Sequence, residues 1–293
     1  MKLAYNSNGW RFGSLEETIQ KLAQLGYSAI ELSCQPHQLF PVHYSKKDAN
    51  AIRQLASEVG IAISNLHAGD RNLLGPNAEP SLINPDANAR KKRLEVNKAA
   101  IDLSVELGTD IMALTSGPLH REMTVSDSWR YLVDGLDQCI KYANEAGVRL
   151  ILEPEPELFV HSITDFLNLV KDLEHPEGFG LNLDIGHSYC MYEDIPAIIR
   201  QTKHLLMHIH LEDISNRQHR HLIPGEGEID FGPVQQALLE IGYSGYVSVE
   251  LQEHTDNPYY AASLSRKNLL SWASSHNRQS KGIRRIWKSS NGA

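Results

Sequence analysis

Apolar residues recur along the chain in one repeating order: an amphipathic helix, a glycine, a short polar step and then a short apolar strand. The first helix begins with a capping box formed by Ser14 and Glu17. Ile19 and Leu22 then share one helical face, and Gly26 ends the helix. Read along the chain, this order predicts eight short strands, at residues 2–5, 29–32, 61–66, 111–114, 148–153, 181–184, 205–210 and 246–250.

The same repeat indicates how these elements assemble. Residues 24–28 (QLGYS) and 240–244 (EIGYS) are near copies, as expected for a closed array of one unit. Eight strands, most of them separated by a crossover helix, fit a (β/α)₈ TIM barrel. A doubly wound open sheet would normally carry a glycine-rich phosphate turn after its first strand, but residues 6–10 read NSNGW. We therefore predict an α/β protein with one TIM-barrel domain over residues 1–276 and a basic C-terminal tail over residues 277–293.

Four of the predicted strands end in side chains that can bind a metal: Glu153, Asp184, His210 and Glu250. The carboxyl ends of barrel strands form the catalytic face, so we expect these four side chains to meet. Burying carboxylates is costly unless a cation or hydrogen-bond donors meet them, and no Lys or Arg ends a strand. This oxygen-rich set predicts one divalent ion, Mn²⁺ or Mg²⁺ first, with Co²⁺ or Zn²⁺ as alternatives.

The alternation of side chains along a strand predicts a layer of polar residues beneath these ligands. Asn182, His208 and Ser248 each precede a predicted ligand by two residues and should also point into the barrel. They either orient the ligands or hydrogen-bond one another and buried water. Glu31, near the end of the second strand, is either a contact at the barrel mouth or a hydrogen-bond partner at a strand end.

Composition narrows the class of protein. The 293 residues are 41% hydrophobic and 22% charged, as in ordinary globular proteins, and the net charge of −8 disfavours a nucleic-acid surface. No signal-like or membrane-spanning apolar run is found. Three widely spaced cysteines indicate free thiols in a reducing compartment. We expect a cytoplasmic protein that does not bind membranes.

Homo-oligomers are also expected, through the barrel's helices or the face of the long loops. Three aromatic side chains near the rim could be exposed there: Trp10, Tyr189 and Tyr192.

Four motifs together resemble one known group. They are the Glu153-Pro154 pair and residues 184–187 (DIGH), 208–211 (HIHL) and 224–231 (PGEGEIDF). In combination they resemble the xylose-isomerase-like TIM-barrel superfamily, from about residue 2 to about residue 276. That superfamily includes sugar epimerases and isomerases, inosose-type dehydratases and metal-dependent AP endonucleases. The chain is most similar to the branch of ketose 3-epimerases and sugar-phosphate isomerase-like proteins.

The resemblance implies roles for individual residues. Glu153, Asp184, His210 and Glu250 would be the metal ligands, and the two glutamates would also be the acid–base pair on opposite faces of a sugar. His187 would hold a substrate oxygen, and Arg217 would contact a substrate hydroxyl or an anionic group. The expected activity is isomerisation or epimerisation of a sugar, sugar phosphate or polyol through an enediolate that a divalent metal stabilises.

Two further histidines are predicted to bind substrate, His67 and His221, although His67 could equally cap a loop or contact a second metal. His221 could also join His187 and His219 in a second metal site, whereas loop histidines such as His219 and His221 are more often solvated.

Three other functions remain open: an AP-endonuclease-like phosphodiesterase, an inosose-type dehydratase and a barrel that binds a metabolite without catalysis. AP endonucleases of this group hold three zinc ions with extra histidines after the third and fourth strands. His67 matches the first, but residues 115–117 (TSG) stand at the second, with His120 beyond them.

Overall fold

The computed structural model describes residues 1–36 and 38–279. In this part of the chain eight parallel strands close into a barrel in the order β1 to β8, with helices between them, which confirms the predicted TIM barrel. The strands are β1 Lys2–Asn6, β2 Ala29–Ser33, β3 Ala62–His67, β4 Ile111–Leu114, β5 Arg149–Leu152, β6 Phe179–Asp184, β7 Leu206–Leu211 and β8 Tyr246–Val249.

The α-helices follow the strands, with two short 3₁₀ helices in the loops. They are α1 Leu15–Gln24, α2 Lys46–Glu58, α3 Ala87–Leu107, α4 Val125–Ala146, α5 Ile163–Asp172, α6 Ile185–Cys190, α7 Ile195–Gln201, α8 Phe231–Glu240 and α9 Pro258–Gln279, with η1 Ser7–Trp10 and η2 Pro76–Ala78. None of the helices in the described residues is long and apolar enough to cross a membrane. Residues 280–293 of the predicted basic tail lie outside the described residues.

By its internal contacts the chain divides into two compact units. The first unit comprises Met1–Glu31, Leu55–Ser64 and the chain from Leu183 onward; the second comprises Leu32–Gln54 and Asn65–Asn182.

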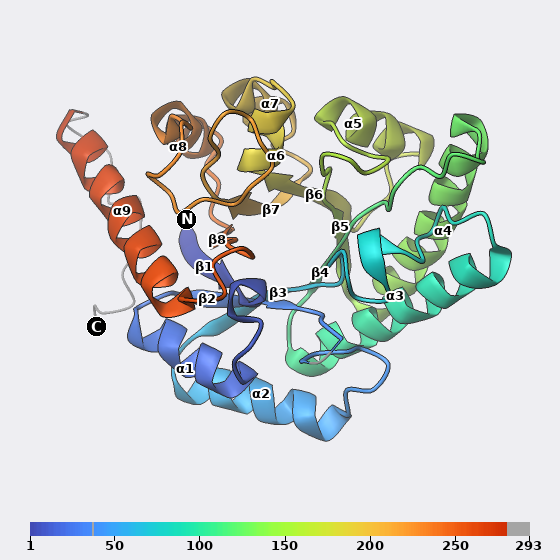
Figure 1. Ribbon diagram of the computed structural model, residues 1–293, viewed down its shortest axis with the longest axis horizontal. Helices are drawn as coiled ribbons and strands as arrows, with labels where there is room; N and C mark the ends of the chain where they lie inside the picture. Colours follow the sequence, from blue (N-terminus) through green and yellow to red (C-terminus); the bar gives the residue numbers. More distant parts are fainter. Residues whose placement is uncertain (37, 280–293) are drawn as a thin grey trace. The chain divides into compact units, whose positions relative to one another are not determined.

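In the first unit, β8 is paired on both sides. It pairs with β1 and with β7, and the register sets Ser248 beside His210. β1 also pairs with β2, which sets Asn6 beside Glu31. Helices α7 and α8 pack side by side (Figure 1). The strand ends of this unit therefore carry a dense group of polar side chains.

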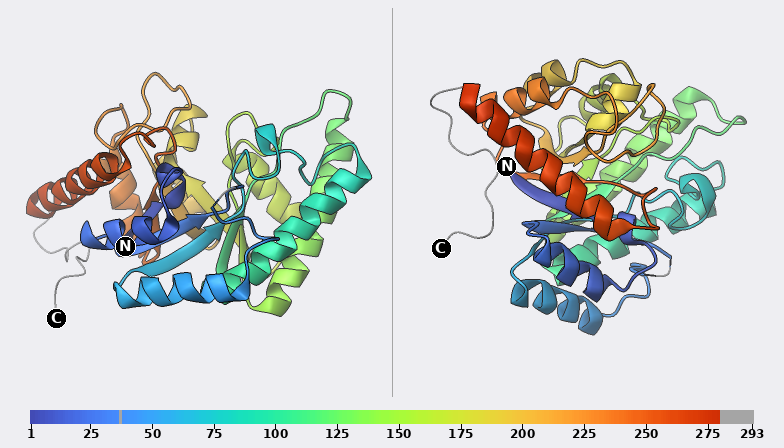
Figure 2. Two further views of the ribbon diagram at one scale, coloured as in Figure 1. Left: turned by 60° about the horizontal axis from the view of Figure 1, so that its bottom comes forward. Right: turned by 60° about the vertical axis from the view of Figure 1, so that its left-hand side comes forward.

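In the second unit, β4 pairs with β3 and β5, and β5 pairs with the first part of β6. That last pairing sets Leu152 beside Leu181. The long helices α3 and α4 run side by side, as the left view of Figure 2 shows. Each described side chain of β4 is buried, as expected for a barrel strand that is covered on both faces.

The near-copied segments of the sequence perform the same structural task twice. Gly26 and Gly242 both have positive φ after a helix, a conformation that costs glycine little. The tyrosine that follows each glycine is anchored by its hydroxyl: Tyr27 donates to the Ala262 carbonyl and Tyr243 to the Tyr246 carbonyl, each at 2.8 Å. The repeat therefore encodes a helix stop and an anchor before the next strand.

The side chain of Trp10 is buried and is not exposed at the rim of the barrel. It is 5% exposed, and its ring meets Tyr5 edge-to-face with centroids 5.8 Å apart. Tyr192, by contrast, is 78% exposed. The expectation that Trp10 lies at the surface is wrong because η1 folds it back over β1.

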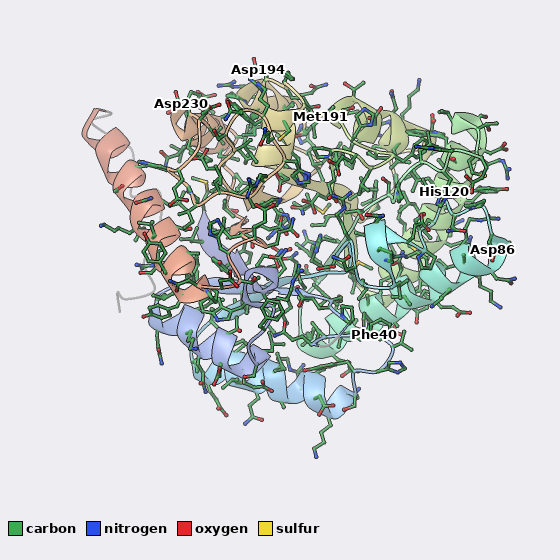
Figure 3. The ribbon with its side chains drawn as sticks, in the orientation of Figure 1. Phe40, Asp86, His120, Met191, Asp194 and Asp230 are labelled. Carbon is green, nitrogen blue, oxygen red and sulfur yellow. The ribbon has the colours of Figure 1, made fainter. Side chains whose placement is uncertain are left out.

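Helix starts are capped by side chains that accept backbone N–H bonds. Asp86, Asp194 and Asp230 occupy this position at α3, α7 and α8 (Figure 3). At α5 the capping is reciprocal: Ser162 accepts from the Asp165 N–H at 3.2 Å, and Asp165 accepts from the Ser162 N–H at 3.2 Å.

Replacing Ser162 with Ala should lower the free energy of unfolding by about 1 kcal/mol, because the first turn of α5 loses its capping acceptor. Urea denaturation followed by circular dichroism measures this change. Ser57→Ala, on the exposed side of α2, is the matched control and should change stability little. Equal effects of the two substitutions would contradict the capping role.

Candidate functional site

Three of the predicted metal ligands meet in the first unit. Asp184, His210 and Glu250 each offer one ligand atom, and these atoms lie within 4.8 Å of one another. All three side chains are buried, with 1%, 0% and 5% of their surface exposed. The strand ends thus gather two carboxylates and an imidazole, as the sequence predicted.

Asp184 has two tasks because it is both the last residue of β6 and the N-cap of α6. Its Oδ1 accepts a hydrogen bond from the His187 backbone N–H at 2.7 Å. Its Oδ2 is buried, no N–H group donates to it, and it lies 3.9 Å from His210 Nδ1. A buried carboxylate oxygen that no N–H group meets is costly, so this atom is suited to a cation.

Glu250 is held by two asparagines that the sequence analysis did not identify. The Asn6 and Asn8 amides both donate to Glu250 Oε1, at 3.0 Å and 2.6 Å. Glu250 Oε2 lies 3.1 Å from His210 Nδ1. The sequence marks them only by the polar residues that follow the first strand, which also exclude a phosphate-binding turn there.

Glu31 joins the two histidines of β7. Its carboxylate lies 2.9 Å from His210 Nε2 and 3.1 Å from His208 Nε2. Burial alone would raise the pKa of Glu31, but the facing His210 and His208 hold that pKa well below its ordinary value. Of the two interpretations from sequence, Glu31 is a hydrogen-bond partner at a strand end.

Glu212, just after β7, is a buried carboxyl that the sequence analysis did not identify. It is 0% exposed, and its carboxyl hydrogen-bonds the Asp184 side chain. Burial raises the pKa of Glu212 well above its ordinary value, and the nearby Asp184 carboxylate raises it further. A Cβ at position 186 would overlap the Glu212 carboxyl, so the glycine of the 184–187 motif makes room for it.

In the second unit, Glu153 is the centre of a smaller polar group. It is 2% exposed and directly follows β5. Its Oε2 lies 3.1 Å from His67 Nε2 and accepts a hydrogen bond from the Asn182 amide at 3.2 Å. Of the two interpretations of the inner polar layer, the orienting one fits Asn182.

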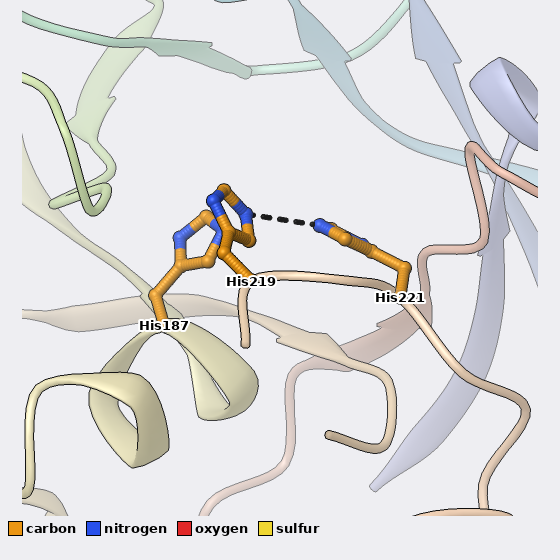
Figure 4. Close-up of side chains that lie close together, drawn as sticks. All are labelled: His187, His219 and His221. Atoms are coloured by element: carbon orange, nitrogen blue, oxygen red, sulfur yellow. Dashed lines mark hydrogen bonds between the residues drawn. The ribbon is translucent and has the colours of Figure 1, made fainter. Parts of the chain in front are cut away.

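Three histidines form a second cluster in the first unit (Figure 4). His187 comes from α6, and His219 and His221 come from the loop after β7. One nitrogen of each lies within 4.8 Å of the others, with the Nε2 atoms of His219 and His221 at 3.3 Å. His221 is only 1% exposed, so the solvated state that is common for loop histidines does not apply to it.

Asp213 buries this loop by binding its backbone. Its carboxylate accepts from four N–H groups, those of Ile214, Gly225, Gly227 and Ile229, at 2.8–3.1 Å. A Cβ at position 227 would overlap Asp213, which explains a glycine in the 224–231 motif. His221 Nδ1 lies 3.1 Å from the Glu250 carbonyl oxygen, so the closed loop also touches the strand-end cluster.

Comparison with known proteins identifies the family. The sequence profile described as "Xylose isomerase-like TIM barrel" matches residues 19–272. The chain belongs to this family. A fructoselysine 3-epimerase of Shigella flexneri is 24% identical over 246 residues, which cover 81% of this chain and 85% of the relative.

Two solved structures share the fold. One is described as a D-tagatose 3-epimerase-like protein, with a TM-score of 0.81 and 23% identity over 95% of this chain and 99% of the other. The second is the protein IOLI with a bound zinc atom, with a TM-score of 0.76 and 21% identity over 94% of this chain and 99% of the other.

Within the xylose isomerase-like barrel, Arg217 lies against α6 and the residues after it. Its guanidinium stacks on the rings of Tyr189 and Tyr192, 4.1 Å and 4.0 Å from their centroids, and donates to the Tyr189 carbonyl. His120, beyond the fourth strand, binds Glu79 at 2.7 Å. This pairing gives His120 a structural role in the loops of the second unit.

Asp213→Ala should lower the free energy of unfolding by about 1–3 kcal/mol, because four backbone N–H groups lose their acceptor. Urea denaturation measures the loss, and faster hydrogen exchange of residues 225–229 should accompany it. Asp256→Ala, at an exposed loop position, is the control. If the two variants are equally stable and exchange alike, Asp213 does not hold the loop closed.

Proposed function

We propose that this protein is a divalent-metal-dependent sugar epimerase or isomerase that transfers a proton next to a ketose carbonyl. The observation that carries the proposal is the buried Asp184–His210–Glu250 cluster, in which two carboxylates meet one imidazole and no N–H group donates to Asp184 Oδ2. Its relatives by sequence include a sugar 3-epimerase. We therefore infer an enzyme with a small sugar-like substrate.

Asp184, His210 and Glu250 would hold the ion, and we propose Glu153 as the fourth ligand. Glu153 directly follows Leu152, which pairs with Leu181 of the strand that ends in Asp184. Carboxylates and one imidazole suit Mn²⁺ or Mg²⁺, and Co²⁺ or Zn²⁺ are the alternatives. The zinc bound to the structural relative supports a divalent cation in this fold.

A divalent ion in this site supplies electrophilic stabilisation for the oxygens of an enediolate. The chain's own residues move the proton. One of the two glutamates, Glu153 or Glu250, removes the proton on carbon, and the other returns one to the opposite face or to the neighbouring carbon.

The neighbours of each glutamate suit this task. Asn6 and Asn8 fix Glu250 through one oxygen, and His67 and Asn182 fix Glu153 through one oxygen. Each carboxylate is thereby held in a defined orientation for proton transfer.

Substrate contacts are proposed for four residues around the strand ends: His67, His187, Arg217 and His221. His187 and His221 are buried beside the cluster of the first unit, where an imidazole can hold a hydroxyl of a sugar. The stacking of Arg217 on two tyrosines leaves it less able to rearrange, which suits a fixed hydroxyl contact better than a mobile anion clamp.

Metal analysis tests the ligand set. The purified protein should bind one Mn²⁺ per chain after dialysis, and Asp184→Ala and His210→Ala should each lose most of it, because each removes a ligand from a buried site. Elemental analysis by mass spectrometry measures the stoichiometry. Glu79→Gln, in the loops of the second unit, is the control. Full occupancy in both ligand variants would show that the ion is bound elsewhere, and three zinc ions per chain would favour the phosphodiesterase.

Glu153→Gln and Glu250→Gln test the proton transfer. Each keeps the side-chain shape and one ligand oxygen but removes the basic charge, so turnover of a ketose substrate should fall by about 10²–10⁴-fold. Metal content, measured in parallel, should fall far less.

Proton exchange between substrate and D₂O then distinguishes the two glutamates. If the two glutamates act on opposite faces of the substrate, one variant should still exchange the substrate proton with solvent without completing epimerisation. Near wild-type turnover in both variants would rule out these glutamates as proton carriers.

A further inference from the structure

Glu31 lies outside the proposed ligand set, yet it directly contacts one of the ligands, His210. Both Glu31 oxygens lie near His210 Nε2, at 2.9 Å and 3.0 Å, and Oε2 also lies 3.1 Å from His208 Nε2. All three side chains are 0% exposed. The cluster is thus a closed polar layer beneath the strand-end site.

The geometry constrains the protons on both rings. An ionised carboxylate only accepts hydrogen bonds, so a nitrogen bonded to it must carry the hydrogen. Nε2 of His208 and Nε2 of His210 therefore both donate to Glu31. Nδ1 of His210 lies 3.1 Å from Glu250 Oε2 and 3.9 Å from Asp184 Oδ2. The same rule places a hydrogen on Nδ1 while no cation is bound, and its replacement by a cation leaves the Nε2–H tautomer.

These three residues could also be regarded as a metal site of their own, since their ligand atoms lie close together. Burial argues against this. An ion there would need entry to a fully enclosed layer, and it would compete with Nε2–H bonds that already meet the Glu31 charge. One ring also cannot serve Glu31 through an Nε2–H and bind an ion through the same nitrogen.

We infer that Glu31 is a positioning residue: it fixes the Nε2–H tautomer and the ring orientation of His210, so that Nδ1 is presented to the space shared with Asp184 and Glu250. Carboxylate–histidine–metal arrangements of this type raise the basicity of the ligating nitrogen. The effect on metal binding rests on the proposed function, whereas the tautomer assignment rests only on the contacts of Glu31 with the two histidines.

The tautomer is measured first, in the metal-free protein labelled with ¹⁵N-histidine at about pH 8, by long-range ¹H–¹⁵N correlation. The wild type should show His208 and His210 with hydrogen on Nε2. A wild-type His210 with a bare Nε2 and hydrogen on Nδ1 alone overturns the proposal, and this result requires no variant to fold.

Glu31→Gln is the variant that tests the cause. A carboxamide can accept from only one ring through its oxygen while its NH₂ donates to the other, so at least one ring should shift its proton to Nδ1. Zn²⁺ affinity, measured by competition with a chelator, should fall by about 10–100-fold. An unchanged pair of tautomers together with an unchanged affinity overturns the proposal.

Two controls isolate the effect. Glu79→Gln alters another glutamate bound to a histidine, His120, away from the strand-end cluster. Ser248→Ala removes a buried hydroxyl from the residue paired with His210 in the β7–β8 register. Both should keep the wild-type tautomers and Zn²⁺ affinity. If Ser248→Ala lowered Zn²⁺ affinity as much as Glu31→Gln, any disturbance of this layer would be enough to weaken metal binding. That result would contradict a specific role for Glu31.

If the proposed metal-dependent function is wrong, the measurements differ from those expected if the proposal for Glu31 is wrong. If the wild type takes up no divalent ion, the metal assignment is wrong, while the ¹⁵N spectra still decide whether Glu31 sets the His210 tautomer.

Discussion

Buried negative charge at the strand ends is the constraint on which the site depends. A carboxylate removed from water must meet donors or a cation, and the first unit buries Glu31, Asp184, Glu212 and Glu250 near one another. Each is accommodated differently. Histidines bind Glu31, asparagines bind Glu250, and burial favours a proton on Glu212, which hydrogen-bonds the Asp184 side chain. The carboxylates of Asp184 and Glu250 still meet beside His210, and this concentration of buried charge is the physical reason to place a cation in the cluster.

The recognisable motifs are explained by packing around these charges. Gly186 leaves room for the Glu212 carboxyl, and Gly227 lets the loop backbone approach Asp213. Asp213 then accepts hydrogen bonds from the backbone of the loop that carries His219 and His221. Residues with no direct part in the proposed chemistry thus decide where the histidines lie.

Sequence alone could predict the barrel because its signal is periodic. The helix–glycine–strand repeat predicted each strand within two residues of its observed ends. The polar residues that close four of the predicted strands marked the candidate ligands, three of which meet in the first unit. Contacts between distant strands have no such pattern. Asn6 and Asn8 bind Glu250 more than 240 residues away, and neither has a spacing that marks it. The burial of His221 was likewise unpredictable, because it arises from loop closure by Asp213 rather than from the polarity of the loop.

The most direct test of the account is deuterium incorporation by the wild-type protein. A panel of ketoses is incubated with the protein and Mn²⁺ in D₂O, and the sugars are analysed by NMR and mass spectrometry. The account predicts that at least one ketose is converted to its epimer or isomer with one deuterium on the reacting carbon, and that a chelator abolishes both conversion and labelling. Conversion that leaves product free of deuterium after many turnovers, or that persists with the metal removed, would contradict it.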